Sequence, residues 1–264
     1  MVTLPKISVV TISYNQALYL DECIRSVLEQ DYPDIEYIIV DPGSTDNSRN
    51  IIQNYSSRLH KIILEPDLGP ADGLNKGFAQ ATGDIFYYLN SDDRVAPGSF
   101  AFVSNFLHKH PSIDVLCGAI RIIDENGKPS IRKRTSDLFS FADYAQGIST
   151  VCQQATFIRR TAFRKAGGFN VQNRISWDGE LLIDLALAGC QYKTVRKVLG
   201  DFRIYSSSIS GSKQYLEKVS HEHRRLNQKM ENANVRLYSS IGGKLRQLLY
   251  KLNIRRHIGY FMAR

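Results

Sequence analysis

Short apolar runs alternate with segments of helical spacing through the N-terminal third of this chain. Four runs rich in β-branched and aromatic residues predict buried strands, at 7–13, 36–40, 61–64 and 85–89. Apolar residues recur at helical spacing between these runs and predict helices, at 17–30, 47–55 and 71–81. Strands that alternate with helices in this way predict a parallel sheet with right-handed crossovers.

The pattern changes in the second part of the chain. Two strand-like runs, 115–123 and 129–134, flank Asn126-Gly127, a dipeptide typical of hairpin turns. Residues 135–150 are polar, and we expect them to be irregular. The other expected elements are a strand at 156–159, helices at 161–166 and 178–187, and strands at 191–199 and 202–205. Beyond Gly211 the chain becomes helical and basic.

The net charge of +8 belongs to the end of the chain. Residues 212–264 hold 12 Lys and Arg but 3 Asp and Glu, whereas residues 1–211 hold 22 basic and 23 acidic residues. We therefore do not expect a basic body that binds nucleic acid. The four cysteines lie far apart without metal-type spacing, which favours buried free thiols in a reducing compartment. We also expect neither a secretory leader nor a membrane-spanning helix, because no window approaches about 20 apolar residues.

Polar side chains follow each of the four predicted N-terminal strands. In chain order they are Thr11, Ser13, Tyr14 and Asn15, then Asp41, then Glu65 and Asp67, then Asn90, Asp92 and Asp93. Ligands of open parallel sheets bind beyond the carboxyl ends of the strands. Crowded carboxylates repel one another and require a cation or a ligand. A hard divalent ion such as Mg²⁺ or Mn²⁺, carrying a diphosphate, meets that requirement.

Glycine-rich phosphate loops are absent from this sequence. No GxGxxG follows the first predicted strand, and no GxxxxGK[ST] occurs anywhere. A diphosphate anchored through a metal ion is the remaining option, and it points to nucleotide-sugar chemistry.

Eight ordered segments then resemble the family 2 glycosyltransferases, which have the GT-A fold. They are VVTISYN (9–15), IIVDPGSTDNS (38–48), EPDLGPADGLNKGFAQATGD (65–84), YLNSDD (88–93), CQQATFIRR (152–160), GGFN (167–170), SWDGELLIDLALAG (176–189) and FRIYSSSIS (202–210). The resemblance implies an α/β, Rossmann-like mixed sheet that is parallel in its N-terminal half. It implies a domain at 1–211, with a nucleotide-binding half at 1–95 and an acceptor-binding half at 96–211. The basic helical extension at 212–264 is not covered by it.

The resemblance also implies roles for single residues. The positions matching nucleotide contacts are Thr11, Ser13, Tyr14, Asp41, Asp67, Asp72 and Lys76. Asp92 matches the metal-holding end of the DxD-type triplet, with Asn90 and Asp93 expected at the donor sugar. Asp178 matches the general base, and Trp177 and Glu180 beside it are expected on the acceptor side.

Two positions depart from the family pattern. Pro42 replaces the second acid of the usual DDGSTD and so removes a carboxylate from the nucleotide side. Tyr205 stands where many relatives have a His that assists the metal.

These assignments imply an inverting transfer of a hexosyl or N-acetylhexosaminyl group in polysaccharide biosynthesis. The donor would be a UDP- or GDP-sugar, and the acceptor a hydroxyl of a glycan or lipid-linked molecule. Asp178 would take the acceptor proton, and Mn²⁺ or Mg²⁺ on Asp92 would stabilise the leaving diphosphate.

Two other functions stay open at this point. A nucleotidyltransferase of nucleotide-sugar synthesis typically carries a GxGTRxxP-type segment where this chain has SYNQAL. A non-catalytic nucleotide-sugar or glycan-binding module is disfavoured by the presence of both Asp92 and Asp178.

The tail has three alternative roles. Leucines and aromatic residues recur at helical spacing among Lys and Arg in 244–264. Such a helix can lie on the inner face of the plasma membrane as a peripheral contact of a cytoplasmic protein. It can equally pack on its own catalytic domain or form a homodimer.

Overall fold

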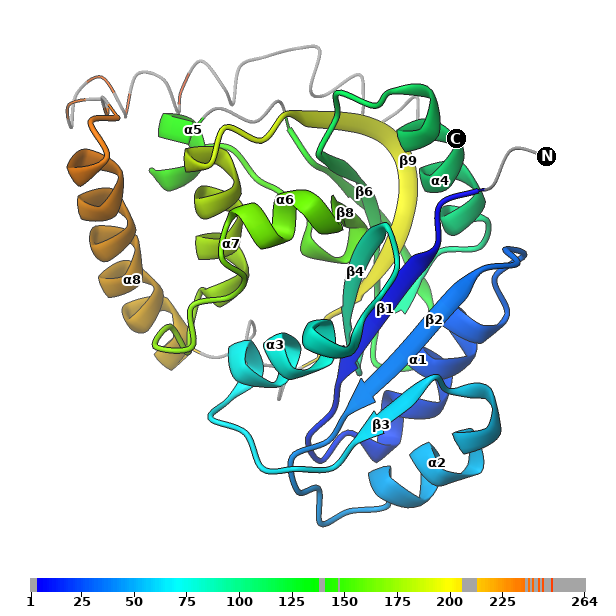
Figure 1. Ribbon diagram of the computed structural model, residues 1–264. Coiled ribbons are helices and arrows are strands. Elements are labelled where there is room, and N and C mark those ends of the chain that lie inside the picture. Colours follow the sequence, from blue (N-terminus) through cyan, green and yellow to red (C-terminus); the bar gives the residue numbers. More distant parts are fainter. Residues whose placement is uncertain are drawn as a thin grey trace.

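The computed structural model describes residues 4–137, 141–146, 148–205 and 213–235, together with 237, 239, 242, 244 and 248. These residues form one nine-stranded mixed sheet in the order β3-β2-β1-β4-β8-β6-β9-β5, with β7 paired to β6. The strands are β1 (Ile7–Ile12), β2 (Ile35–Val40), β3 (Lys61–Ile63), β4 (Ile85–Asn90), β5 (Arg94–Val95), β6 (Val115–Ile123), β7 (Pro129–Thr135), β8 (Thr156–Arg159) and β9 (Tyr192–Arg203). Figure 1 shows helices on both faces of this sheet.

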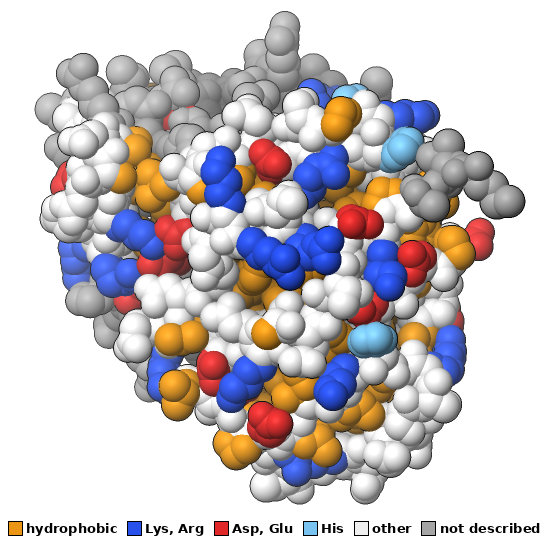
Figure 2. Space-filling view, viewed as in Figure 1, with side chains coloured by type: hydrophobic (Ala, Val, Ile, Leu, Met, Phe, Trp, Pro, Cys, Tyr) orange, Lys and Arg blue, Asp and Glu red, His pale blue; other side chains and the backbone are white. Residues whose placement is uncertain are grey.

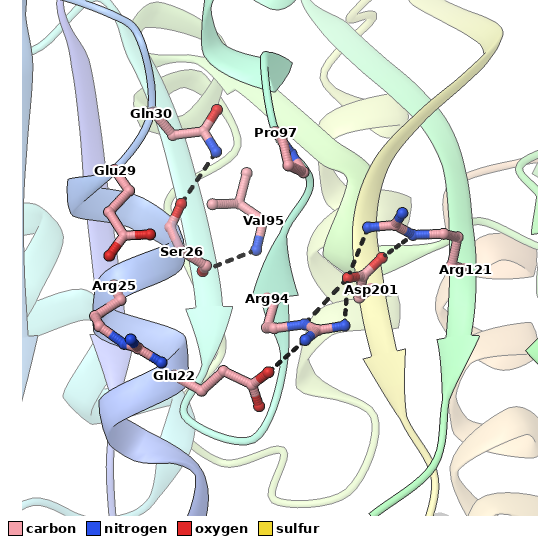
Figure 3. Close-up of a pocket in the computed structure, with 10 residues that line it drawn as sticks. All are labelled: Glu22, Arg25, Ser26, Glu29, Gln30, Arg94, Val95, Pro97, Arg121 and Asp201. Carbon is pink, nitrogen blue, oxygen red and sulfur yellow. Dashed lines mark hydrogen bonds and ion pairs between the residues drawn. The ribbon is translucent and has the colours of Figure 1, made fainter. Parts of the chain in front are cut away.

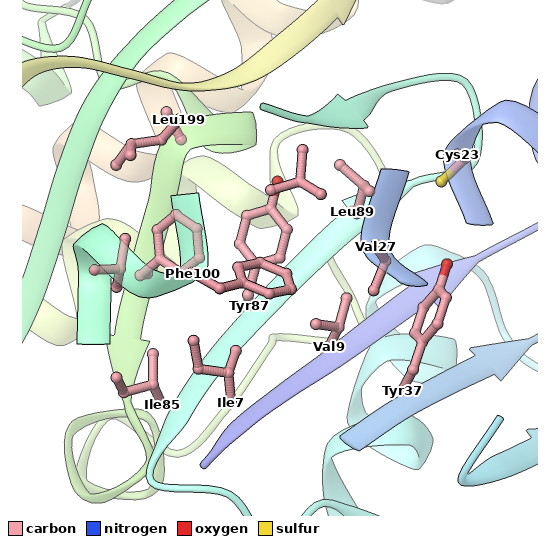
Figure 4. Close-up of a cluster of buried hydrophobic side chains, with 14 of the residues drawn as sticks. Ile7, Val9, Cys23, Val27, Tyr37, Ile85, Tyr87, Leu89, Phe100 and Leu199 are labelled. Atoms are coloured by element: carbon pink, nitrogen blue, oxygen red, sulfur yellow. The ribbon is translucent and has the colours of Figure 1, made fainter. Parts of the chain in front are cut away.

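The helices cover the sheet in two layers. They are α1 (Ala17–Leu28), α2 (Ser48–Asn54), α3 (Pro70–Gln80), α4 (Ser99–Lys109), α5 (Phe141–Ala145), α6 (Arg160–Lys165), α7 (Trp177–Leu187) and α8 (Lys213–Asn232), with short 3₁₀ turns η1 (Ser56–Arg58) and η2 (Gln153–Ala155). One core lies between the sheet and α1, α2 and α4, as Figure 4 shows around Val9, Tyr87 and Phe100. The other lies beneath α3, α6 and α7. Burial of apolar residues on both faces explains why the N-terminal strands are continuously hydrophobic.

The predicted parallel half of the sheet is confirmed. β1 pairs in parallel with both β2 and β4, and β3 extends β2 in parallel. The carboxyl ends of these strands therefore meet at one edge, as the sequence pattern requires. β8 pairs antiparallel with β4 and begins the mixed half.

Two predictions of secondary structure were wrong, and one strand was missed. The strands expected at 191–199 and 202–205 are one continuous β9, because Gly200 and Asp201 pair with both β5 and β6. The segment 135–150, expected to be irregular, contains the short helix α5. β5 was not predicted, since two residues carry no periodic signal.

The described cysteines, Cys23, Cys117, Cys152 and Cys190, are buried and free, as expected. None of the helices in the described ranges is long and apolar enough to cross a membrane. On the face shown in Figure 2, basic side chains are interspersed with acidic ones, in keeping with the balanced charge of residues 1–211.

The first helix of the basic tail packs on the main domain. Leu226 and Met230 of α8 are buried against Ala145 of α5 and Ile183 of α7. The membrane, subunit and packing alternatives for 244–264 concern residues outside the described ranges, apart from Lys244 and Leu248.

Candidate functional site

The Asn90–Asp93 run forms a tight turn at the end of β4. The Asp93 N–H donates to the Asn90 carbonyl at 3.1 Å. The Asp93 carboxylate is 1% exposed and accepts from the Arg203 backbone N–H at 2.9 Å and from Gln154 Nε2 at 3.0 Å. Burial, together with the neighbouring Asp92 charge, raises the pKa of Asp93 well above its usual range. Asp93 therefore fixes the turn against β9 and η2, and a donor-sugar contact from it stays a prediction.

Asp92 is the less buried carboxylate of this turn. Its Oδ2 accepts from the Tyr205 hydroxyl at 3.0 Å, and burial raises its pKa. Within the described ranges no Lys or Arg forms an ion pair with it, and no three His, Cys, Asp or Glu side chains group to hold a metal. The Asp92 carboxylate is half-buried, and Arg203 acts on it through its charge while its Nε binds the backbone carbonyl of Asp92. Such a carboxylate fits a divalent ion that takes most of its ligands from a bound diphosphate.

Arg203 holds the same turn from behind and was missed by the sequence reasoning. Its side chain is 1% exposed, and its Nε donates to the Asp92 carbonyl at 2.8 Å. One terminal nitrogen donates to the carbonyls of Asp124 and Glu125, both at 3.1 Å, while the other pairs with Glu22. An arginine at the end of a strand that also contains Lys193, Arg196 and Lys197 gives no sequence signal for such a role.

The 41–49 loop is organised around the Asp41 carboxylate. Asp41 is fully buried and accepts from the Ser44 N–H at 2.8 Å, the Ser44 hydroxyl at 2.6 Å and Arg49 Nε at 3.1 Å. Burial alone would raise its pKa, but the hydrogen bonds from Ser44 and Arg49 outweigh burial and lower it. The carboxylate thus shapes the loop, and its contact with the base stays a prediction.

The three residues expected from the end of β1 differ in their surroundings. Thr11 is fully buried, and its hydroxyl lies 3.0 Å from the Tyr37 hydroxyl, so the side chain faces the core. Ser13 is 2% exposed, and its hydroxyl has no partner among the described residues. Tyr14 is 61% exposed. Of these three side chains Tyr14 is therefore the one open to solvent, while Ser13 holds a buried hydroxyl.

The expected nucleotide contacts between β3 and α3 stabilise that connection. Asp67 Oδ1 accepts from the Gly69 N–H at 2.8 Å, and burial raises the Asp67 pKa. Asp72 Oδ2 accepts from the Leu68 N–H at 2.9 Å and pairs with Lys76 at 3.1 Å. Lys76 also donates to the Pro66 carbonyl at 2.7 Å. These bonds order the loop beside the strand ends, and nucleotide contacts from its members stay predictions.

A cavity of about 300 Å³ joins the end of β4 to the start of α7. Its described lining includes Asn90, Gln153, Arg134, Arg174, Trp177 and Asp178. The Asp178 carboxylate accepts from the Gly179 N–H at 2.8 Å, and burial raises its pKa. Trp177 packs on Tyr88 and Phe169 in the core while lining the cavity. The cavity therefore brings Asp178, the expected base, and Asn90, which is expected at the donor sugar, to one space.

Asp178 does not cap its helix. The N-cap position of α7 is Ser176, and Asp178 lies in the first turn. A carboxylate there is stabilised by the positive end of the helix dipole.

Glu180, which was expected on the acceptor side, is not among the described residues that line this cavity. It is 1% exposed, and its carboxylate accepts from Asn170, Asn173, Arg225 and Lys229. These contacts lower its pKa to about 2 against the cost of burial. Asp178 and Glu180 are two residues apart on α7, so their side chains do not share a face. Glu180 instead joins α8 to the loop 170–176.

A second cavity, of about 340 Å³, lies behind the turn between α1, β5 and β9. Figure 3 shows Arg94 reaching both Glu22 and Asp201, with Arg121 on the other side of Asp201. Asp201 is 2% exposed and is neutralised by these two arginines. With Arg203, this network supports the Asp92–Asp93 turn, and each of its cations is already paired.

The family model described as "Glycosyl transferase family 2" matches residues 8–167. The chain is 32% identical over 214 residues to an uncharacterized glycosyltransferase of Nostoc sp., covering 77% of this chain and 66% of that protein. Among solved structures, Staphylococcus aureus TarS 1–349 with UDP-GlcNAc has a TM-score of 0.67 at 18% identity, covering 96% of this chain and 72% of that one. The mannosyltransferase PcManGT of Pyrobaculum calidifontis, with GDP-Man and Mn²⁺, has a TM-score of 0.64 at 18% identity, covering 99% and 74%. These structures share the fold of this chain.

Proposed function

Because this chain belongs to glycosyl transferase family 2, we propose that it transfers a sugar from a nucleotide-diphosphate sugar to a hydroxyl group, with inversion at the anomeric carbon. The observation that carries this proposal is the shared cavity of Asn90 and Asp178. It leaves space between the donor-side strand end and a carboxylate that can accept a proton.

Asp178 is the residue that acts on the acceptor. A hydroxyl is a weak nucleophile until a base removes its proton, and a positioned carboxylate contributes about 10²–10⁴ in rate. Burial raises the pKa of Asp178 and so makes the ionised carboxylate a stronger base. Trp177, held by Tyr88 and Phe169, forms a rigid wall beside it for an acceptor sugar.

Asp92 would hold a Mn²⁺ or Mg²⁺ ion, which supplies Lewis-acid stabilisation of the leaving diphosphate when bound. Tyr205 keeps the Asp92 carboxylate oriented through its 3.0 Å hydrogen bond. Arg203 and Gln154 keep the turn itself in place. The fold neighbours bound to UDP-GlcNAc and to GDP-Man with Mn²⁺ support a UDP- or GDP-sugar as donor and a divalent ion as cofactor.

The proposal is tested with purified full-length protein and a panel of UDP- and GDP-sugars in the presence of Mn²⁺. We expect one donor to raise the melting temperature and to undergo metal-dependent hydrolysis that Asp92→Ala abolishes. A ligand at about 100 times its dissociation constant adds roughly 2.7 kcal/mol of stability, which such a scan detects. Asp178→Asn should retain donor binding and lose transfer to an acceptor. Normal transfer by that variant would refute the base assignment.

The same assays separate the alternatives. A nucleotidyltransferase would form nucleotide sugar from a sugar phosphate and a nucleoside triphosphate. A binding module would bind the donor without consuming it.

The membrane contact proposed for 244–264 needs a separate test. Liposome flotation should compare the full-length protein with a variant in which Arg255 and Arg256 are replaced by Gln. This design keeps α8 intact, since α8 packs on the main domain. Equal binding to anionic vesicles by both proteins would argue against the contact.

A further inference from the structure

Two arginines line the cavity of Asp178. The guanidinium groups of Arg134 and Arg174 make no ion pair or hydrogen bond within the described ranges, whereas those of Arg94, Arg121 and Arg203 are all paired. Asp178 is the single acidic side chain among the described residues that line this cavity. The lining therefore carries a surplus of positive charge next to the proposed base.

The backbone that carries Arg134 is fixed to the cavity wall. Arg134 pairs with Ile120 across β6 and β7, and Ile120 also lines the cavity. Beyond the strand, the Ser136 hydroxyl accepts from the Cys152 N–H at 3.0 Å. The end of β7 is thus held against the segment that leads into η2.

The loop that carries Arg174 is equally ordered. Asn173 Oδ1 accepts from the N–H groups of Ile175 at 3.0 Å and Ser176 at 2.9 Å. Asn173 Nδ2 donates to Glu180 at 2.8 Å, which ties the loop to α7. Arg174 therefore projects from a fixed loop a few residues before Asp178.

The position of these arginines favours the acceptor over the donor diphosphate. Asp92, the expected metal-holding residue, is not among the residues that line this cavity, whereas Asp178 is. An acceptor hydroxyl must reach Asp178, so groups adjacent to that hydroxyl lie within the same space. Guanidinium groups bind planar carboxylate and phosphate oxygens through paired hydrogen bonds.

We propose that this cavity binds an acceptor carrying a phosphate or carboxylate next to its reacting hydroxyl, and that Arg134 and Arg174 hold that anionic group. The inference rests on the proposed function, because it names the class of acceptor for the same site. It predicts that a neutral glycan with no anionic substituent near the hydroxyl is a poor acceptor.

The experiment measures binding of small probes to the full-length protein by calorimetry. The anionic probes are sn-glycerol 3-phosphate and glucuronate, and the matched neutral probes are glycerol and glucose. The variants are Arg134→Gln and Arg174→Gln. Arg164→Gln is the control, since it removes the same charge from an exposed position on α6 outside the cavity lining. UDP and GDP are titrated with Mn²⁺ in parallel.

We expect at least one anionic probe to bind and its neutral counterpart not to. Arg134→Gln and Arg174→Gln should each raise the dissociation constant of the anionic probe by roughly tenfold or more, as loss of a charge-assisted hydrogen bond implies. Arg164→Gln and the nucleotide affinities should be unchanged. Saturable binding of neither anion, or equal binding of neutral and anionic probes, overturns the inference.

Weaker UDP or GDP binding by the cavity variants would also overturn it, because the arginines would then serve the donor. Failure of the anion site leaves the proposed function intact if nucleotide-sugar hydrolysis persists. The absence of any nucleotide-sugar binding or hydrolysis would refute the proposed function itself.

Discussion

Replacement of Glu180 by Gln should loosen α8 and the loop 170–176 together. Glu180 is buried, and its two oxygens bind Arg225 and Lys229 of α8 as well as Asn170 and Asn173 of the loop. Gln keeps the size of the side chain but removes the charge that attracts both cations. One substitution therefore weakens both the contact between α7 and α8 and the contact between α7 and the loop 170–176, which carries Arg174.

The size of the expected loss of stability follows from the pKa of Glu180. It lies at about 2, against an ordinary value of 4.5. Each tenfold change in a dissociation constant is worth about 1.4 kcal/mol, so the native contacts favour the ionised form by roughly 3 kcal/mol at neutral pH. Arg225 and Lys229 are 35% and 32% exposed, so solvent screening reduces the net value to about 2 kcal/mol.

The direction of the Glu180 pKa shift determines how this stability depends on pH. A carboxyl pKa lowered by folding adds stability above its unfolded value, and this stability is lost as the pH falls from 4.5 toward 2. The free energy of unfolding of the parent protein should exceed that of Glu180→Gln by about 2 kcal/mol at neutral pH. The difference should shrink steadily once the pH drops below the ordinary glutamate pKa.

Urea denaturation at several pH values measures this difference, and amide hydrogen exchange reports α8 and the loop 170–176 separately. Glu231→Gln is the matched control, because it removes the same charge from an exposed position on α8. Its stability should stay within about 0.5 kcal/mol of the parent. Equal stability of the two variants at neutral pH would refute the reasoning. So would a difference that does not change as the medium is acidified.

Three further substitutions test other parts of the site. Gly200→Ala should destabilise the protein by about 1–3 kcal/mol or more in denaturant unfolding, because an added Cβ would lie 2.1 Å from the Gln154 carbonyl oxygen; parental stability would contradict this packing. Asp178→Asn should melt at or above the parental temperature at neutral pH. Burial raises the Asp178 pKa, so ionisation costs stability as the pH rises through that range, and a clear loss of stability would contradict this account. Thr11→Val should cost about 1–3 kcal/mol by leaving Tyr37 without its buried partner and should leave nucleotide affinity unchanged in calorimetry; a large loss of affinity would restore Thr11 as a nucleotide contact.

Local pattern determined most of the fold. The four N-terminal strands and their helices were predicted from periodicity, because strands buried on both faces are continuously apolar and the helices between them are amphipathic. β6 and β8 were predicted with the bounds that they have. The errors fell where long-range pairing overrides local preference, as in β5 and the continuous β9.

The sequence by itself determined the kind of chemistry at the carboxyl edge of the sheet. It showed that the basic charge belongs to the tail, and the family resemblance pointed to Asp92 and Asp178 as the central carboxylates, roles that stay predictions. What only the tertiary structure decided is which side chains face a ligand and which face one another. Glu180 stands two residues from Asp178 yet binds α8, because the helix turns it to another side. Arg134 and Arg174, far apart in sequence, line one cavity because β7 and the loop before α7 both contribute to its lining. Such contacts depend on the packing of distant segments, which the periodicity of a single segment does not encode.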